Sequence, residues 1–393
     1  MTSDRLLDTT RTILGDLIAC PSVSADSNLD LIGHADDHLR AAGARTRILH
    51  DDSGQKANLF ATFGPDGDGG IVLSGHTDVV PATPDEWSSD PFTLRQADGR
   101  LYGRGACDMK GFIAAVLALA PQFGAAPLRR PLHVALTYDE EVGCFGAQHL
   151  VRALRDSGLS PSVAIIGEPT EMRVIEGHKG CHEYTTRFTG REGHGSDPDA
   201  GINAIEYATR FVGRLLDLRD ELKARTSSDN RFSPPWSTVQ VGHIEGGSAR
   251  NVIAGHCAVD WELRPITQED ADHATQTMQN YATDVLLPAM RTVAPEARIE
   301  TEVIAEVIGL EPASRNEARD IAFALTGQDM ADLVPFGTEA GLFQTMGLSA
   351  VVCGPGSIAQ AHKADEFVTL SQLRQCLDML EGLLPRLQAQ GRP

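Results

Sequence analysis

Imidazole and carboxylate side chains follow four apolar segments of this sequence, at the points where those segments end. They are His76 and Asp78 after residues 71–74, Glu140 and Glu141 after 131–138, Glu168 after 162–166, and His362 beyond 350–353. Borderline cations such as zinc bind both of these ligand types. Two acids and two imidazoles exceed the needs of one catalytic zinc, but with a bridging acid they suit two ions about 3.5–4 Å apart.

Asp108 is the best candidate for the bridging acid. It lies in a glycine-flanked turn at the start of an expected helix, and the glycines let the backbone approach the metals. Asp78 is near enough to orient His76, because a ligating imidazole usually donates its other N–H to a carboxylate. Glu140 and Glu141 are adjacent and point in different directions, so one can ligate a metal while the other takes a proton from water.

Taken alone, each of these motifs has a plain structural alternative. A His-x-Asp sequence is common by chance, three consecutive acids at 139–141 are typical of a solvated turn, and Asp108 could simply cap a helix. Their joint placement at successive strand ends favours a metal site, because open α/β sheets place their functional sites at the carboxyl ends of the strands.

The spacing of the apolar residues predicts helices that alternate with short strands around these motifs. We expect helices between Ser3 and Pro21 and at 28–42, 110–123, 145–156 and 315–326, and strands at 45–49, 58–63, 71–74, 131–138, 162–166 and 350–353. This alternation predicts an α/β domain whose mostly parallel sheet is flanked by helices. The segment GRGACD at 103–108 follows no evident strand and is no dinucleotide-binding motif.

Between residues 181 and 306 the order of the expected elements changes to β-α-β-β-α-β, which is typical of a ferredoxin-like unit. The strands are 181–189, 237–244, 256–263 and 297–305, and the helices are 202–218 and 268–293. We therefore predict a discontinuous catalytic domain of residues 1–180 and 307–393, which carries an inserted α+β lid or dimerisation domain of residues 181–306. One amphipathic helix over 370–388 closes the chain.

The composition excludes several classes of protein. Among 393 residues, 54 Asp and Glu outnumber 34 Lys and Arg, which gives a formal net charge of −20. Such a surface disfavours binding to nucleic acids and to anionic lipids. The 7 cysteines are scattered and predict no disulfide framework. No apolar run approaches the ~20 residues of a membrane span, and the N-terminal residues do not read as a signal peptide, so we expect a cytoplasmic protein.

Five segments together make the sequence resemble the M20 family of dinuclear zinc aminoacylases and exopeptidases. They are LSGHTDVVP (73–81), YGRGACDMKGFIAA (102–115), TYDEEVGCFGA (137–147), GEPT (167–170) and GPGSIAQAHKADEFV (354–368), in the family order. The resemblance implies two Zn²⁺ ions per subunit, for which Co²⁺ can substitute. The metal ligands it implies are His76 and Glu168 for one ion, Glu141 and His362 for the other, and Asp108 for both. Asp78 would orient His76, and Glu140 would be the general base.

The resemblance also implies roles for three residues of the insert. His194 matches a family histidine that reaches the active site of the partner subunit and stabilises the oxyanion, so the resemblance implies a homodimer that forms through the insert. Asn251 and Arg264 match the residues that help to hold the substrate carboxylate. The family usually has Ala where this chain has Gly195.

Within the family, the segment FGTEAGLFQ (336–344) and the segment around His362 resemble the acetylornithine deacetylase branch. That resemblance implies hydrolysis of N2-acetyl-L-ornithine to L-ornithine and acetate, a step of arginine biosynthesis. Other M20 activities stay open: deacetylation of N-acetyl-citrulline or N-acetyl-diaminobutyrate, desuccinylation of N-succinyl-diaminopimelate, and cleavage of dipeptides. A non-catalytic amino-acid-binding protein is disfavoured, because all the expected ligands and the base are present. His178 and His182, at the expected domain junction, have no assigned role.

Overall fold

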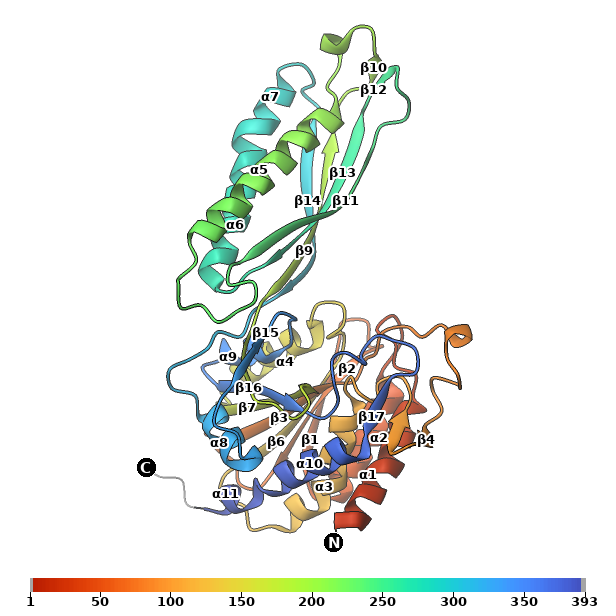
Figure 1. The fold of residues 1–393 in the computed structure, drawn as a ribbon, viewed down its shortest axis with the longest axis vertical. Helices are drawn as coiled ribbons and strands as arrows, with labels where there is room; N and C mark the ends of the chain where they lie inside the picture. The colour runs from red at the N-terminus through yellow and green to blue at the C-terminus, as the bar shows by residue number, and fades with distance from the viewer. Residues whose placement is uncertain (1–2, 390–393) are drawn as a thin grey trace. The chain divides into compact units, whose positions relative to one another are not determined.

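The computed structural model describes residues 3–389, and these divide into two compact units (Figure 1). Unit 1 comprises the described residues up to Gly177, Pro312–Asp332 and those from Thr338 on. Unit 2 comprises His178–Glu311 and Leu333–Gly337, so the expected insert lies wholly within it. Among the helices of the described residues, none combines the length and the hydropathy that a membrane span requires.

Unit 1 is built on a large sheet. Its strands, in spatial order, are β1 (Arg45–His50), β2 (Ala57–Phe63), β6 (Leu132–Thr137), β3 (Ile71–His76), β7 (Val163–Pro169), β16 (Ser349–Gly354) and β8 (Ile175–His178). The four central strands β6, β3, β7 and β16 run parallel, whereas β2 and β8 pair antiparallel with their neighbours. The carboxyl ends of the central strands therefore share one edge, as the sequence predicted.

Helices cover both faces of this sheet (Figure 1). One face packs against a layer that contains α1 (Ser3–Ile18), α2 (Leu29–Ala41), α3 (Lys110–Ala125), α8 (Glu317–Thr326) and α10 (Leu370–Glu381). The other face packs against α4 (Phe145–Ser157) and α9 (Ala340–Gln344). The sequence of α3 is rich in small and apolar residues. This composition agrees with its central position, because the helix is buried along most of its length. The predicted α/β fold with a helix-flanked sheet is confirmed.

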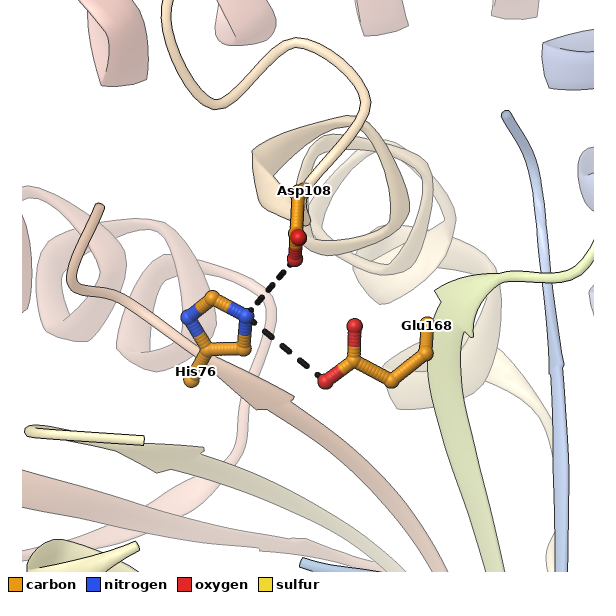
Figure 2. A group of neighbouring side chains, drawn as sticks. All are labelled: His76, Asp108 and Glu168. Atoms are coloured by element: carbon orange, nitrogen blue, oxygen red, sulfur yellow. Dashed lines mark hydrogen bonds and ion pairs between the residues drawn. The ribbon is translucent and has the colours of Figure 1, made fainter. Parts of the chain in front are cut away.

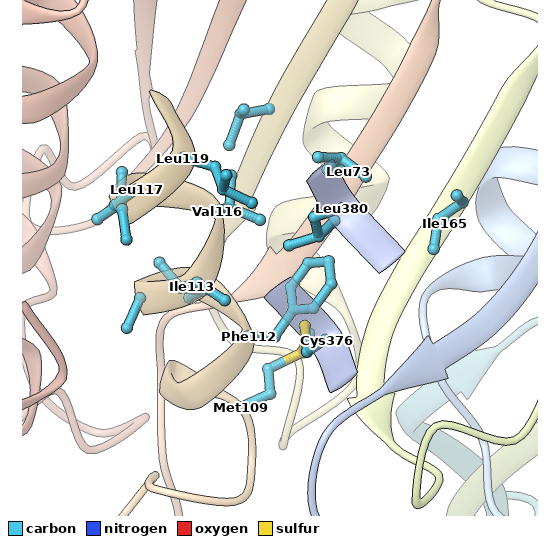
Figure 3. Close-up of a cluster of buried hydrophobic side chains, with 14 of the residues drawn as sticks. Leu73, Met109, Phe112, Ile113, Val116, Leu117, Leu119, Ile165, Cys376 and Leu380 are labelled. Carbon is cyan, nitrogen blue, oxygen red and sulfur yellow. The ribbon is translucent and has the colours of Figure 1, made fainter. Parts of the chain in front are cut away.

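Phe112 of α3 explains why a glycine precedes two of the expected site residues. Its ring packs among the apolar side chains between α3, α10 and the sheet (Figure 3). A Cβ atom at position 167 would lie 2.0 Å from Cγ of Phe112, and Gly75 faces the same helix. Because side chains alternate across a strand, His76 and Glu168 point away from α3.

The prediction of one closing helix is wrong in one respect, because two separate helices form in this segment. Helix α10 ends at Glu381, and α11 spans Leu384–Gln388. Pro385 lies in the first turn of α11 and has no N–H with which to continue the hydrogen-bond ladder of α10.

A small three-stranded sheet connects the chain before Asp108 with the chain after His362. Strand β5 (Arg100–Tyr102) pairs with β4 (Arg95–Ala97) on one side and with β17 (Phe367–Thr369) on the other. The segment GRGACD therefore does follow a strand, contrary to the expectation. A strand of three residues is too short to leave an alternating pattern in the sequence.

Unit 2 has the β-α-β-β-α-β order of a ferredoxin-like fold. Its antiparallel sheet has the order β11-β13-β9-β14, with β9 (Cys181–Thr189), β11 (Thr238–Gly246), β13 (His256–Arg264) and β14 (Arg298–Val307). Helices α5 (Ala204–Ala224) and α6 (Gln268–Asn280) share an apolar core with the sheet. The expected long helix continues from α6 through a π-helical segment (Tyr281–Leu286) into α7 (Leu287–Arg291).

Candidate metal centre

Two groups of side chains in unit 1 have the geometry of metal sites, and Asp108 belongs to both. One group is His76, Asp108 and Glu168, and the other is Asp108, Glu141 and His362. In each group the possible ligand atoms lie within 4.8 Å of one another. Figure 2 shows the first group, whose side chains converge from the end of β3, the loop before α3 and the end of β7.

Each carboxylate oxygen of Asp108 faces one of the two groups. Oδ1 lies 2.9 Å from Nε2 of His76, and Oδ2 lies 3.4 Å from Nε2 of His362. Nε2 of His76 is also 3.6 Å from Oε1 of Glu168, and Nε2 of His362 is 2.9 Å from Oε2 of Glu141. This arrangement suits a carboxylate that bridges two cations.

The charges at this centre also fit divalent cations. Asp108 and Glu168 are buried, and Oε1 of Glu168 has no hydrogen-bond partner among the described residues. A buried charge is stable only when it is paired or binds a metal. Three carboxylates and two imidazoles converge here, so two cations would supply the positive charge that the side chains lack.

Crowding of the carboxylates changes the pKa values of the group. Burial raises the pKa of Glu168 well above its usual value, and Asp108 raises it further against the opposing effect of His76. Burial disfavours the charged form of His76, but Glu168 and Asp108 outweigh it and raise the pKa of His76 well above normal. Hydrogen bonds to Asp108 and Glu141 raise the pKa of His362 to about 10. Cations must displace these protons, so metal affinity should increase with pH.

Asp78 is buried behind His76 and organises the segment that carries Glu140 and Glu141. Nδ1 of His76 lies 2.9 Å from the backbone carbonyl oxygen of Asp78 and 3.5 Å from its Oδ1. The Asp78 carboxylate accepts hydrogen bonds from Oγ of Ser24 at 2.7 Å and from the N–H groups of Glu140 at 3.1 Å and Glu141 at 3.3 Å. The expected contact with His76 is therefore made mainly through the carbonyl group, while the carboxylate positions the two acids.

Glu140 lies beside the two groups and belongs to neither. It follows Asp139, whose φ of 54° places the backbone in the left-handed region. Burial raises the pKa of Glu140 well above normal, an effect that His76 opposes and that Glu141 and Asp108 reinforce. A half-buried carboxyl group with a raised pKa next to a set of ligands has the properties of a general base.

Two buried glutamates near this centre were missed by the sequence analysis. Glu339 accepts hydrogen bonds from Thr137 at 2.7 Å and from Ser74, at the ends of β6 and β3. Glu366 accepts a hydrogen bond from the backbone N–H of Asp108 at 3.0 Å. These partners are 202 to 265 positions apart in the sequence, so no local pattern could reveal them.

Comparison with known proteins supports the metal centre. The sequence profile of Peptidase family M20/M25/M40 matches residues 72–386. The chain belongs to the M20 family. It is 35% identical over 359 residues to an acetylornithine deacetylase from Shigella sonnei, over 90% of this chain and 91% of that protein. The predicted resemblance is confirmed, and the chain is a hydrolase of this family.

Solved structures show the same fold. A dipeptidase from Saccharomyces cerevisiae matches with a TM-score of 0.72 and 17% identity, over 99% of this chain and 98% of that chain. An M20 family metallo-carboxypeptidase from Sulfolobus solfataricus matches with a TM-score of 0.72 and 15% identity, over 96% of this chain and 99% of that chain. Membership in a family of metallopeptidases implies that this chain binds divalent metal.

His194 and Asn251 of this M20 protein are neighbours in unit 2. His194 lies on the short strand β10 (Gly193–His194), which pairs with β12 (Val252–Ile253) immediately after Asn251. The N–H of Gly195 donates to the carbonyl of Asn251 at 2.8 Å. A Cβ at position 195 would lie 2.9 Å from the carbonyl carbon of Asn251, so an alanine at this position would crowd the backbone of Asn251.

Arg264 lies in a different part of unit 2. It ends β13, where its Nη2 is 3.0 Å from Oε2 of Glu262. His194 and Asn251 lie near the other end of β13, which begins at His256. The 9 residues of β13 span about 27 Å at ~3.3 Å per residue. Arg264 and Asn251 of one chain are therefore too far apart to hold the same small carboxylate.

Proposed function

We propose that this M20 protein is a dinuclear zinc-dependent deacetylase that hydrolyses N2-acetyl-L-ornithine to L-ornithine and acetate. The position of Asp108, shared by two groups of ligand atoms, carries the metal part of the proposal. The substrate rests on the 35% identity to an acetylornithine deacetylase over 90% of this chain. We expect cobalt to substitute for zinc, because imidazole and carboxylate ligands bind both ions.

The side chains of unit 1 would divide the work between binding and proton transfer. The metal ligands would be His76 and Glu168 for one cation, Glu141 and His362 for the other, and Asp108 for both. Bound cations would lower the pKa of water and polarise the substrate carbonyl. Glu140 would take the proton from the attacking water and return it to the leaving amine. Burial raises the pKa of Glu140, so it needs positive charge beside it to be ionised before the reaction.

We propose that the active enzyme is a homodimer. His194 would donate a hydrogen bond to the developing oxyanion, and Asn251 and Arg264 would bind the α-carboxylate of the substrate. Arg264 ends β13, and Asn251 lies near the start of that strand, so one carboxylate can contact both only if they come from two copies of unit 2. The edge strands β11 and β14 offer unpaired backbone groups to a second copy.

Metal removal tests the first part of the proposal. Exhaustive chelation should abolish hydrolysis of N-acetyl-L-ornithine, and added zinc or cobalt should restore it. Metal analysis of the restored enzyme should find two ions per chain. Hydrolysis that continues in demonstrably metal-free protein would refute the metal-dependent mechanism.

A panel of substrates tests the second part. N-acetyl-L-ornithine is compared with N-acetyl-L-citrulline, N-acetyl-diaminobutyrate, N-succinyl-diaminopimelate and dipeptides. We expect kcat/KM for N-acetyl-L-ornithine to exceed each of the others by about tenfold or more. A higher kcat/KM for another member of the panel would reassign the substrate and leave the metal centre unaffected.

A further inference from the structure

The carboxylate of Glu366 holds the loop that carries Asp108. Its Oε1 accepts hydrogen bonds from the backbone N–H groups of Cys107 at 2.8 Å and Asp108 at 3.0 Å. Its Oε2 accepts from the N–H of Gly105 at 3.1 Å and from Nη1 of Arg104 at 2.7 Å. One side chain thus fixes five consecutive residues, 104–108, at four points.

Burial makes these contacts hard to replace. Glu366 is 1% exposed and Arg104 is 3% exposed, so water cannot take over their hydrogen bonds. The Arg104 guanidinium is held on its other side by the ring of Trp87, whose centroid is 5.1 Å away, and by the carbonyl of Pro81 at 3.2 Å. The positive charge of Arg104 also balances the negative charge of the Glu366 carboxylate. The loop is therefore fixed without additional net charge beside Asp108.

Glu366 also joins the two sides of the metal centre. It follows His362 by four positions, and the strand after it, β17, pairs with β5 immediately before the loop. His362 has a φ of 60°, a conformation that a non-glycine residue keeps only when its surroundings impose it. A fixed connection between residues 104–108 and 362–366 sets the 3.4 Å separation of Asp108 Oδ2 and His362 Nε2.

We propose that Glu366 is a positioning residue of the dinuclear centre, which orients Asp108 and thereby sets the affinity for both cations. The inference rests on the proposed function, in which Asp108 bridges the two ions. Because Asp108 belongs to both ligand groups, its displacement weakens both sites together. Loss of a ligand that belongs to one group, such as His362, weakens mainly one site.

Calorimetric titration of metal-free protein with zinc tests this proposal. Glu366→Gln keeps one oxygen that can accept from Cys107 and Asp108, but it loses the ion pair with Arg104. Glu366→Ala loses all four contacts. Mutation of groups that orient metal ligands typically lowers metal affinity about 10–100-fold, so we expect about tenfold weaker binding at both sites for Glu366→Gln and about 100-fold for Glu366→Ala.

Glu176→Gln is the matched control. Glu176 is also buried and also pairs with an arginine, Arg319, at 2.8 Å, but the pair joins β8 to α8 rather than the Asp108 loop. This variant should bind both ions as tightly as the wild type. His362→Ala gives the contrasting pattern, with the affinity of one ion reduced far more than that of the other.

The outcomes separate this inference from the proposed function. Zinc affinities of Glu366→Gln equal to those of the wild type would overturn the positioning role, as would a loss confined to one ion. If the wild-type chain itself binds no zinc, the proposed function fails instead. Far-UV circular dichroism checks folding, and if Glu366→Ala does not fold, Glu366→Gln, which conserves the side-chain volume, decides the question.

Discussion

Among the individual residues, Asp108 differs from the other acids around it. Burial would raise its pKa, but hydrogen bonds from His362 and His76 outweigh burial and lower it. Burial and neighbouring charges raise the pKa values of Glu140 and Glu168 instead. Asp108 therefore stays ionised at every pH at which an ordinary aspartate is ionised. It supplies a constant negative charge between the two groups of ligands.

Glu140→Gln tests the division between ligands and base. The variant should still bind two cations, because Glu140 belongs to neither ligand group. It should lose turnover, since general-base catalysis contributes typically about 10²–10⁴-fold. The measurements are kcat and KM with N-acetyl-L-ornithine, together with the metal content of the same sample.

Glu86→Gln, which changes an exposed glutamate of unit 1, is the control and should leave kcat unchanged. Wild-type turnover in Glu140→Gln would reject its role as base. Loss of a cation together with turnover would instead make Glu140 a ligand.

The residues that could be foreseen from the sequence share one physical property. Residues such as His76 and Glu168 directly follow buried segments, and the ends of parallel strands must meet at one edge of a sheet. Glu366 and Glu339 could not be foreseen, because their partners are backbone N–H groups and hydroxyl groups on distant segments. Such contacts depend on the finished fold and leave no spacing in the sequence.

At the scale of secondary-structure elements, the packing of α3 on β7 positions the metal centre. Gly167→Ala should destabilise unit 1, because its Cβ would lie 2.0 Å from Phe112 Cγ. Overpacking of a core costs typically about 1–3 kcal/mol, and the backbone of β7 and the ring must both move here. Thermal and urea-induced unfolding measure the change.

Gly33→Ala is the control for this substitution. Gly33 lies in α2, and a Cβ there would meet no atom within 4 Å. Alanine in an exposed helix position is favoured over glycine by roughly 0.5–1 kcal/mol, so this variant should be more stable than the wild type. A Gly167→Ala protein as stable as the wild type would show that Phe112 does not restrict this position.

Strand β6 buries a histidine whose titration should make the stability of unit 1 depend on pH. His133 is 1% exposed, with Nδ1 2.9 Å from Oγ1 of Thr62. Burial, and to a smaller extent the charge of Arg45, lowers its pKa to about 4. In the unfolded chain the pKa is about 6.5, so the unfolded state binds the proton more readily. The contribution of neutral His133 to the stability of the fold is therefore fully present above about pH 6.5 and is lost as the pH falls towards 4.

Lowering the pH from 7 to 5 should therefore reduce the free energy of unfolding by about 2 kcal/mol through this one histidine. Urea-induced unfolding at the two pH values should show that His133→Gln loses about this much of the pH dependence of the wild type. His256→Gln, which replaces an exposed histidine, should retain the wild-type dependence. Equal pH dependence in His133→Gln and wild type would mean that His133 takes up its proton in the folded state.

The longer elements could be predicted, whereas the short ones could not. The long apolar run of α3 and the buried run of β3 extend over enough residues to stand out. Strands β4, β5 and β17 have 3 residues each, and pairing with distant segments determines them rather than their composition. The part of the fold that fixes the Asp108 loop is therefore the part that the sequence pattern does not reveal.

The whole molecule needs a second copy if the three residues of unit 2 serve one active site. Arg264 ends β13, whereas Asn251 lies near the start of that strand, whose 9 residues span about 27 Å at ~3.3 Å per residue. A substrate carboxylate that contacts both must lie between two chains. We expect a mass of twice 42.2 kDa in solution by light scattering. A fully active monomer would contradict the shared site.

Mixed dimers test directly whether His194 acts on the partner subunit. Chains with Glu140→Gln and chains with His194→Ala should each be inactive as homodimers. When the two are co-expressed, a mixed dimer has one site in which an intact Glu140 meets an intact His194 of the other chain. Random pairing makes half of the dimers mixed, with one working site of two, so about one quarter of the wild-type rate should return.

The control pairs Glu140→Gln with a chain that carries both substitutions. This pairing leaves no site with an intact Glu140, so no activity should return. Native mass spectrometry must show that mixed dimers form in both experiments. If they form and the first pairing recovers nothing, His194 serves the metal centre of its own chain, and the two-chain active site is rejected. Recovery in the first pairing alone can arise only from a site that two chains build together.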